Sequence, residues 1–510
     1  MKSRNIGIFL SYTNILVNMV CGLLLSVFLL RKLGATDYGV YQAVATFVNC
    51  LVLLEFGTGT AMTRNLVSSL ARGRNEEDLA RNISTIWGIA CFLNLIIFIV
   101  SIIFYLLIEY IYAKSMTASQ IADAKGIFIF MAIYLMVSFA TQTLSGMPLA
   151  FEDYSFSAKI SIFRNTLRTI FIVIIVLYYQ KAIMVAIIDS CLSILLFLFT
   201  YVYCRKKFKV DINFSHFDKA VLKLTLPFCF ALFLQIVVTQ TNSTVGKFIT
   251  SVMLAPEKVA LYSIGLYIFG IFSSIATIPV SMYMPQIAND ITSGMNGLTL
   301  TKSLIQPSRL IVLISGLIAF GFIAAGRQFI TILYGHEFIQ AWLIAVILIV
   351  PMFINMSNAV VINVLDIKNK RHIRSLIMMA STVINIFLTI IWLKMFDVIG
   401  AAYSTGLSTI IMLILTNWYY SRAIGIKVMY LYQQAYKGIL IYQILGAGVA
   451  YIAGTAVSNV YCSFAISSIV FIIIAGGGFL LHGINTVEKK FFQKIIFQVK
   501  SIFHKRFYCN

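Results

Sequence analysis

Polar side chains interrupt several apolar segments of this 510-residue chain, and their spacing places hydrogen-bonding groups together on one face of a helix. Amide and hydroxyl groups are dense between residues 235 and 247, inside an otherwise apolar stretch. Gln235, Thr239 and Asn242 recur at intervals of four and three, so on a helix they share one face. Such groups donate and accept hydrogen bonds, so this face is a candidate for binding a polar ligand. The alternative is hydrogen bonding to neighbouring helices.

Ionisable groups within apolar segments are costly, so they normally face protein or water. Glu55 is either a cavity group or an ion-paired anchor near a helix end. Arg168 and Arg309 lie deeper in apolar segments, and their planar guanidinium groups match phosphate or carboxylate oxygens unless they reach toward the membrane surface. Asp189 is interpreted as the buried partner of another helix. The candidate cavity residues are Asn14, Asn18, Asn49, Glu55, Arg64, Arg168, Gln235, Thr239, Asn242, Lys247 and Arg309.

No catalytic constellation accompanies these groups. The sequence has no H-E-x-x-H motif, no Walker lysine after a glycine loop and no C-x-x-C pair. The outer gaps between apolar segments are too short to build an active site, and no paired carboxylates or nucleophile constellation appears in the sequence. We therefore predict no catalytic residue, no metal site and no cofactor, and the chain holds no ATP-driven pump of its own.

Fourteen apolar segments position the candidate residues. The chain is 60% hydrophobic and 11% charged, far from the composition of soluble domains. A bilayer core about 30 Å thick is crossed by about 20 helical residues. The first segment is too long for a signal-peptide core and is interpreted as a helix. We predict an all-α polytopic membrane protein with crossings at 6–30, 39–63, 83–108, 126–147, 160–179, 182–203, 222–246, 259–283, 303–325, 338–362, 373–393, 398–420, 438–459 and 462–482.

Basic residues alternate between the two sides of the membrane. With the N-terminus inside, about 28 Lys and Arg fall on the inner side and about 9 on the outer side. Both termini are therefore predicted to be cytoplasmic. The net charge of +21 reflects this bias and attraction to anionic lipid headgroups, so nucleic acid is not an expected partner.

The two halves of the chain resemble each other. A shift of about 221 residues aligns Leu33 with Leu254, Val40 with Leu261 and Tyr41 with Tyr262. Six crossings separate the copies, so both halves enter from the same side and are related by an axis along the membrane normal. We predict two six-helix lobes (1–210 and 211–425) around a central cavity, an extra helix pair (426–485) and a basic cytoplasmic tail (486–510).

Several short motifs in order carry a family resemblance. They are 32–41 (KLGATDYGVY), a bend at 55–59 (EFGTG), the polar loop 64–81, 261–263 (LYS), 283–286 (YMPQ), and 332–335 (ILYG) with Glu337. Together they resemble polysaccharide flippases of the Wzx type, in the superfamily that also holds the MATE drug antiporters and the lipid II flippase MurJ. The resemblance covers most of residues 1–420.

The resemblance implies translocation of an undecaprenyl-pyrophosphate-type oligosaccharide from the inner to the outer leaflet by alternating access. It also implies a place in the inner membrane beside polysaccharide polymerase and glycosyltransferases, for O-antigen or capsule synthesis. A cation-coupled MATE-type efflux pump is the alternative, although the segment 6–30 holds no Asp or Glu. A non-transporting scaffold subunit is a third hypothesis, which the polar face at 235–242 disfavours.

Overall fold

The computed structural model describes residues 2–73, 76–208, 216–368, 370–485 and 488–489. Within these ranges, the side chains of residues 2–12, 154, 235, 238–243, 281 and 371–372 are outside the description. Helices dominate the described residues, which contain no strand. The predicted all-α fold is confirmed.

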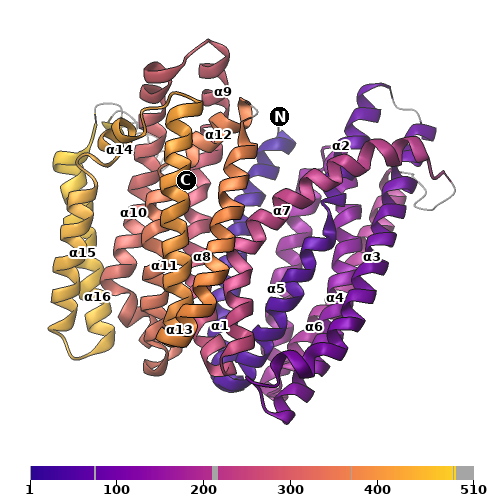
Figure 1. The fold of residues 1–510 in the computed structure, drawn as a ribbon, viewed down its shortest axis with the longest axis horizontal. Helices are drawn as coiled ribbons and strands as arrows, with labels where there is room; N and C mark the ends of the chain where they lie inside the picture. The colour runs from indigo at the N-terminus through magenta and orange to yellow at the C-terminus, as the bar shows by residue number, and fades with distance from the viewer. Residues whose placement is uncertain (1, 74–75, 209–215, 369, 486–487, 490–510) are drawn as a thin grey trace, which may run out of the picture. The chain divides into compact units, whose positions relative to one another are not determined.

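Figure 1 shows the order of the helices along the chain. The first eight α-helices are α1 (Lys2–Leu51), α2 (Thr58–Ala71), α3 (Glu76–Tyr112), α4 (Ala118–Ala150), α5 (Tyr154–Tyr178), α6 (Ile183–Phe208), α7 (Lys219–Met253) and α8 (Pro256–Met282). They are followed by α9 (Met284–Thr292), α10 (Gly297–Tyr334), α11 (Gln340–Met356), α12 (Ala359–Ile367), α13 (Arg371–Ala423), α14 (Val428–Tyr436), α15 (Leu440–Thr455) and α16 (Val460–Phe471). Short helical segments are η1 (Val52–Glu55), η2 (His336–Phe338), η3 (Ile472–Gly476) and η4 (Phe479–Gly483).

The described helices are consistent with the predicted number of about fourteen crossings. Ten described helices are long and apolar enough to span a membrane, and α14 with α15 forms a further span bent by 53°. Two of the ten contain two predicted crossings each, because α1 breaks at Gly34 (φ 81°) and α13 breaks at Asp397 (φ 53°). The 35-residue helix α7 corresponds to the remaining predicted crossing, which brings the number of crossings to fourteen.

Two crossings are less regular than a single helix. The bend predicted at 55–59 is present, because Phe56 (φ 53°) and Gly57 (φ 64°) are both left-handed and separate η1 from α2. The segment 338–362 was predicted as one helix but forms η2, α11 and α12. Breaks of this kind inside a spanning segment are tolerated where protein or water surrounds the backbone, and Ser357 and Asn358, between α11 and α12, are fully buried.

The chain forms two compact units. Unit 1 comprises residues 1–267 and 375–408, and unit 2 comprises 268–374 and 409–510. Unit 1 includes α7 because this helix packs on α1 and α3. The lobe boundaries inferred from the sequence repeat stay a prediction.

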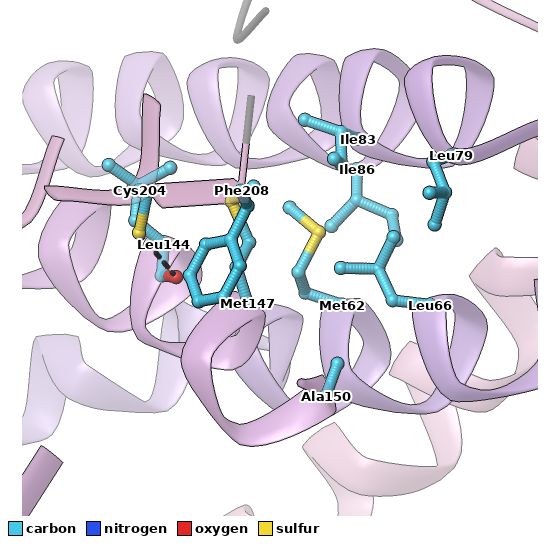
Figure 2. Packing of buried hydrophobic residues seen from close by; sticks show 10 residues of the cluster. All are labelled: Met62, Leu66, Leu79, Ile83, Ile86, Leu144, Met147, Ala150, Cys204 and Phe208. Carbon is cyan, nitrogen blue, oxygen red and sulfur yellow. Dashed lines mark hydrogen bonds between the residues drawn. The ribbon is translucent and has the colours of Figure 1, made fainter. Parts of the chain in front are cut away.

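A core of apolar side chains joins four helices of unit 1 (Figure 2). The side chains come from α2, α3, α4 and α6 at helical spacings of three and four. The cluster consists of Met62, Leu66, Leu79, Ile83, Ile86, Leu144, Met147, Ala150, Cys204 and Phe208. It fixes the ends of α4 and α6 against each other, and these helices carry the site described below.

The start of α5 is held by a polar contact to α6. Asp153 accepts hydrogen bonds from Lys207, Tyr203 and Ser155. Partial burial raises the pKa of Asp153, but the hydrogen bonds from these three side chains outweigh it and hold the pKa below its ordinary value. These contacts hold the start of α5 beside α6.

The two repeated segments meet within unit 1. Thr36 donates a hydrogen bond to Glu257, and these residues are 221 positions apart, the same shift that aligns the halves. Beside them, a Cβ added to Gly39 would lie 1.9 Å from the carbonyl oxygen of Pro256. This backbone approach therefore requires glycine at position 39.

In unit 2, α10 packs against α14, α15 and α16. Small residues at the contact let the helices approach closely, as is common in membrane proteins. The buried cluster comprises Ala324, Ala447, Ala450, Phe471 and Ala475. Figure 1 shows α15 and α16 side by side in yellow.

Candidate functional site

Two polar helix faces meet inside unit 1. On α4, Tyr134, Ser138, Thr141 and Ser145 recur at intervals of four, three and four. On α5, Ser157, Ser161, Arg164 and Arg168 follow the same intervals. These intervals place each set on one face of its helix. Since α4 and α5 are in contact, the two sets line a shared space.

This space consists of three adjoining pockets among α1, α4, α5 and α6, of about 360, 250 and 190 Å³. Arg164 lines all three, so we treat them as one polar chamber. Its polar lining consists of Tyr41, Asn49, Glu55, Tyr134, Ser138, Thr141, Gln142, Ser145, Ser157, Ser161, Arg164, Asn165, Arg168, Asp189 and Ser193. Some of the hydroxyls bond to their own helix, as Thr141 does to the Val137 carbonyl oxygen at 2.8 Å.

Arg168 is neutralised by a two-pronged ion pair in the chamber wall. Its Nε donates to Asp189 Oδ1 at 2.5 Å and its second nitrogen donates to Asp189 Oδ2 at 2.9 Å. This pair confirms the interpretation of Asp189 as the partner of another helix. A paired guanidinium of this kind has little net charge to offer a ligand.

Arg164 has a different environment. Its guanidinium donates to the hydroxyl of Tyr134 at 2.8 Å and lies 5.4 Å from the centre of that ring. Among the described residues, no carboxylate lies within ion-pair distance of it. Tyr134 is a neutral partner, so it does not compensate the positive charge of Arg164. That charge is therefore available to a ligand in the chamber.

Glu55 and Asn49 line the same 250 Å³ pocket as Arg164. Glu55 Oε1 is buried and has no hydrogen-bond partner among the described residues. A buried oxygen without a partner is costly, and a ligand or water removes that cost. Asn49 is exposed, so the chamber opens to the surface of unit 1 beside α1.

Asn14 and Asn18 lie next to the chamber. The Asn18 amide donates to Asn14 Oδ1 at 3.3 Å. Asn165 from α5, which lines the chamber, donates to Asn18 Oδ1. The predicted asparagine pair on α1 is therefore connected to the site through this contact.

Arg64 and Lys247 do not line these pockets. The Arg64 guanidinium lies 4.2 Å from the centre of the Phe228 ring on α7. Lys247 donates to Gln42 Oε1 at 2.7 Å, which joins α7 to α1. Arg64 therefore contacts α7, and Lys247 belongs to α7. Neither forms an ion pair with a carboxylate among the described contacts.

Arg309 lies in unit 2 and is buried. Its five N–H groups are all engaged. They donate to the carbonyl oxygens of Gln434 (2.9 Å), Lys437 (2.8 Å) and Gly483 (2.7 Å), and to both oxygens of Glu488 (2.8 and 3.4 Å). In this arrangement no donor remains for a headgroup, so Arg309 joins α10 to the segments around α14 and η4.

Gln235, Thr239 and Asn242 lie in α7, but their side chains are outside the described residues. Their predicted role in binding stays a prediction.

Arg164 is not among the residues predicted from sequence, because it lies near the predicted inner end of the segment 160–179, where the positive-inside bias already accounts for an arginine. The signal was available. Arg164 precedes Arg168 by four residues, so the two share a helix face, and Ser157 and Ser161 extend that face. Gln142 and its polar neighbours on α4 also follow helical intervals. Sequence alone does not show that they line the same space as Arg164, because the contact between α4 and α5 is known only from the structure.

A family model identifies the family of the chain, and solved structures share its fold. The family model described as "Polysaccharide biosynthesis protein" matches residues 5–289, more than half of the chain. No curated protein matches the sequence at a significant level. A structure titled lipid II flippase MurJ, in an inward closed conformation, has a TM-score of 0.71 at 14% identity, covering 93% of this chain and 98% of that one.

Multidrug transporters share the fold as well. An inward-facing MATE family transporter of the MOP superfamily has a TM-score of 0.60 at 12% identity, covering 82% of this chain and 96% of that one. A eukaryotic MATE transporter has a TM-score of 0.59 at 11% identity, covering 88% and 99%. At these identities the likeness shows the fold alone.

Proposed function

The chain belongs to the polysaccharide biosynthesis protein family, and on this premise we propose that it is a flippase for a lipid-linked oligosaccharide. It moves the sugar headgroup from the inner to the outer leaflet of the cytoplasmic membrane, on a polyprenyl pyrophosphate carrier, by alternating access. It acts between the glycosyltransferases that build the oligosaccharide and the polymerase that extends it.

The polar chamber is the observation that carries this proposal. Each hydroxyl left without a partner in hydrocarbon costs several kcal/mol, so an oligosaccharide does not cross lipid unaided. The chamber offers amides, hydroxyls and charged groups between helices that are long and apolar enough to span a membrane. An apolar drug has no need of so many hydrogen-bonding groups. The fold is therefore compatible with the MATE-type alternative. The polar lining of the chamber favours the flippase.

Flipping is tested with the purified chain in proteoliposomes that hold a fluorescent polyprenyl-pyrophosphate disaccharide. We expect a membrane-impermeant quencher to reach more of the lipid than in protein-free liposomes, because inner-leaflet lipid is brought out. Heat-inactivated protein serves as the control. Equal quenching with and without active protein would contradict the proposal, and ion-driven export of a cationic dye by the same vesicles would favour the efflux pump.

We expect both termini on the cytoplasmic side, because the Lys and Arg residues divide about 28 to 9 between the predicted sides. Reporter fusions after Lys181, Lys258 and Tyr334 should then report an outer location. A fusion after Arg205 is the matched control and should report inside. An inner location at two of the three outer positions would overturn the orientation.

A further inference from the structure

The charges that line the polar chamber nearly cancel. Arg168 and Asp189 neutralise each other through their two-pronged pair. Arg164 and Glu55 remain, and both line the 250 Å³ pocket, without an ion pair between them. The chamber thus presents one cation and one buried acceptor at separate points of its wall.

A pyrophosphate is a poor match for this lining. It brings about two negative charges, which need cationic partners when they leave bulk water. Arg164 supplies one positive charge, and the other guanidinium in the lining, Arg168, is already paired with Asp189, so a second negative charge would find no cationic partner in the chamber. A carboxylate carries a single charge and fits the planar donors of one guanidinium.

The remaining groups suit the hydroxyls of a sugar ring. Glu55 Oε1 is an unpartnered acceptor. Gln142 and Asn49 line the same pocket and offer both amide donors and acceptors. Tyr134 fixes one side of Arg164 through its hydroxyl at 2.8 Å, which leaves other N–H donors of the guanidinium for a ligand.

We propose that the polar chamber is a subsite for an acidic sugar of the lipid-linked oligosaccharide, with the sugar carboxylate on Arg164 and its hydroxyls on Glu55 and Gln142. The inference rests on the proposed flippase function and adds a substrate class to it. Arg164 binds the carboxylate and so distinguishes an acidic sugar from a neutral one, while the pyrophosphate is bound outside the chamber.

Two lipids that differ only in the carboxylate test this assignment. One is a polyprenyl-pyrophosphate disaccharide that contains glucuronic acid, and the other carries glucose at that position. We expect the wild-type chain to flip the acidic lipid about tenfold faster or more, since a charge-assisted contact of this kind contributes about 1.4 kcal/mol or more. Arg164→Gln should bring the two rates together by slowing only the acidic lipid.

Matched variants separate this role from a structural one. Lys159→Gln removes an exposed charge from the same helix and should leave the ratio of the two rates unchanged. Arg164→Lys should keep part of the preference, because a point charge lacks the guanidinium geometry. If Arg164→Gln does not fold, Arg164→Lys provides the test. A ratio of the two flipping rates equal to the wild-type ratio in this variant would overturn the assignment.

Other outcomes have distinct meanings. Equal slowing of both lipids by Arg164→Gln would place Arg164 on the shared pyrophosphate or in the framework, and would overturn the acidic-sugar subsite. A wild-type chain that flips both lipids at equal rates would overturn it as well. A wild-type chain that flips neither lipid would overturn the flippase function itself.

A binding measurement without any pyrophosphate gives a second readout. The free glucuronic-acid disaccharide should raise the thermal unfolding midpoint of the wild-type chain in detergent, and the glucose disaccharide should raise it less. Arg164→Gln should remove the difference between the two sugars. A difference that persists in this variant would contradict the role of Arg164.

Discussion

Arg309→Met is expected to lower the stability of the protein by about 3–5 kcal/mol, because it leaves the buried Glu488 carboxylate without its partner. Three carbonyl oxygens, from Gln434, Lys437 and Gly483, also lose their donors. Heating of the detergent-solubilised protein, followed by size-exclusion chromatography, should show a markedly lower midpoint. Arg309→Lys should recover only part of it, since an ammonium has three donors in place of five.

The matched control is Lys302→Met, which removes an exposed charge from the same helix. Surface changes of this kind normally stay within about 0.5 kcal/mol. An Arg309→Met protein with the wild-type midpoint would show that these hydrogen bonds do not hold unit 2 together.

Gly39→Ala should have an effect of similar size in unit 1. The added Cβ would lie 1.9 Å from the oxygen and 2.4 Å from the carbon of the Pro256 carbonyl. Both are backbone atoms, so no side-chain rotation relieves the clash, and α1 must move away from α8. We expect a loss of about 3 kcal/mol, at the upper end for overpacking, measured as a lower unfolding midpoint and a lower yield of monodisperse protein.

Gly270→Ala is the control for this substitution. Gly270 lies in α8, and an added Cβ would meet no atom within 4 Å. Alanine has the higher helix propensity, so the variant should be neutral or more stable by up to about 1 kcal/mol. Equal midpoints for Gly39→Ala and Gly270→Ala would contradict the close contact between α1 and Pro256.

The crossings could be predicted from sequence because membrane burial is a local signal. Apolar runs of about 20 residues and the polar gaps between them are visible without knowledge of any contact. This signal separated the two halves of α13 at Asp397, where the backbone is helical on either side. The irregular segments were harder, because the division between α11 and α12 lies inside an apolar run.

Some of the residues singled out from sequence lie in the polar chamber, and their role in binding stays a prediction. Glu55, Asn49 and Arg168 do line the polar chamber, since costly groups in apolar segments gather in protein interiors. The partners of Arg309 could not be foreseen, because Glu488 and the carbonyl of Gly483 are more than 170 positions away along the chain. Local sequence holds no information on contacts of that range.

The hydrogen bond between Thr36 and Glu257 bears on the origin of the chain. Two residues related by the repeat contact each other only at the axis that relates the repeats. In a homodimer of a single six-helix ancestor, each such position would face its own copy, threonine against threonine or glutamate against glutamate. Two facing carboxylates repel each other. In a single chain the two positions carry different residues, so this constraint is absent, and Thr36 serves as the hydroxyl donor while Glu257 serves as the carboxylate acceptor.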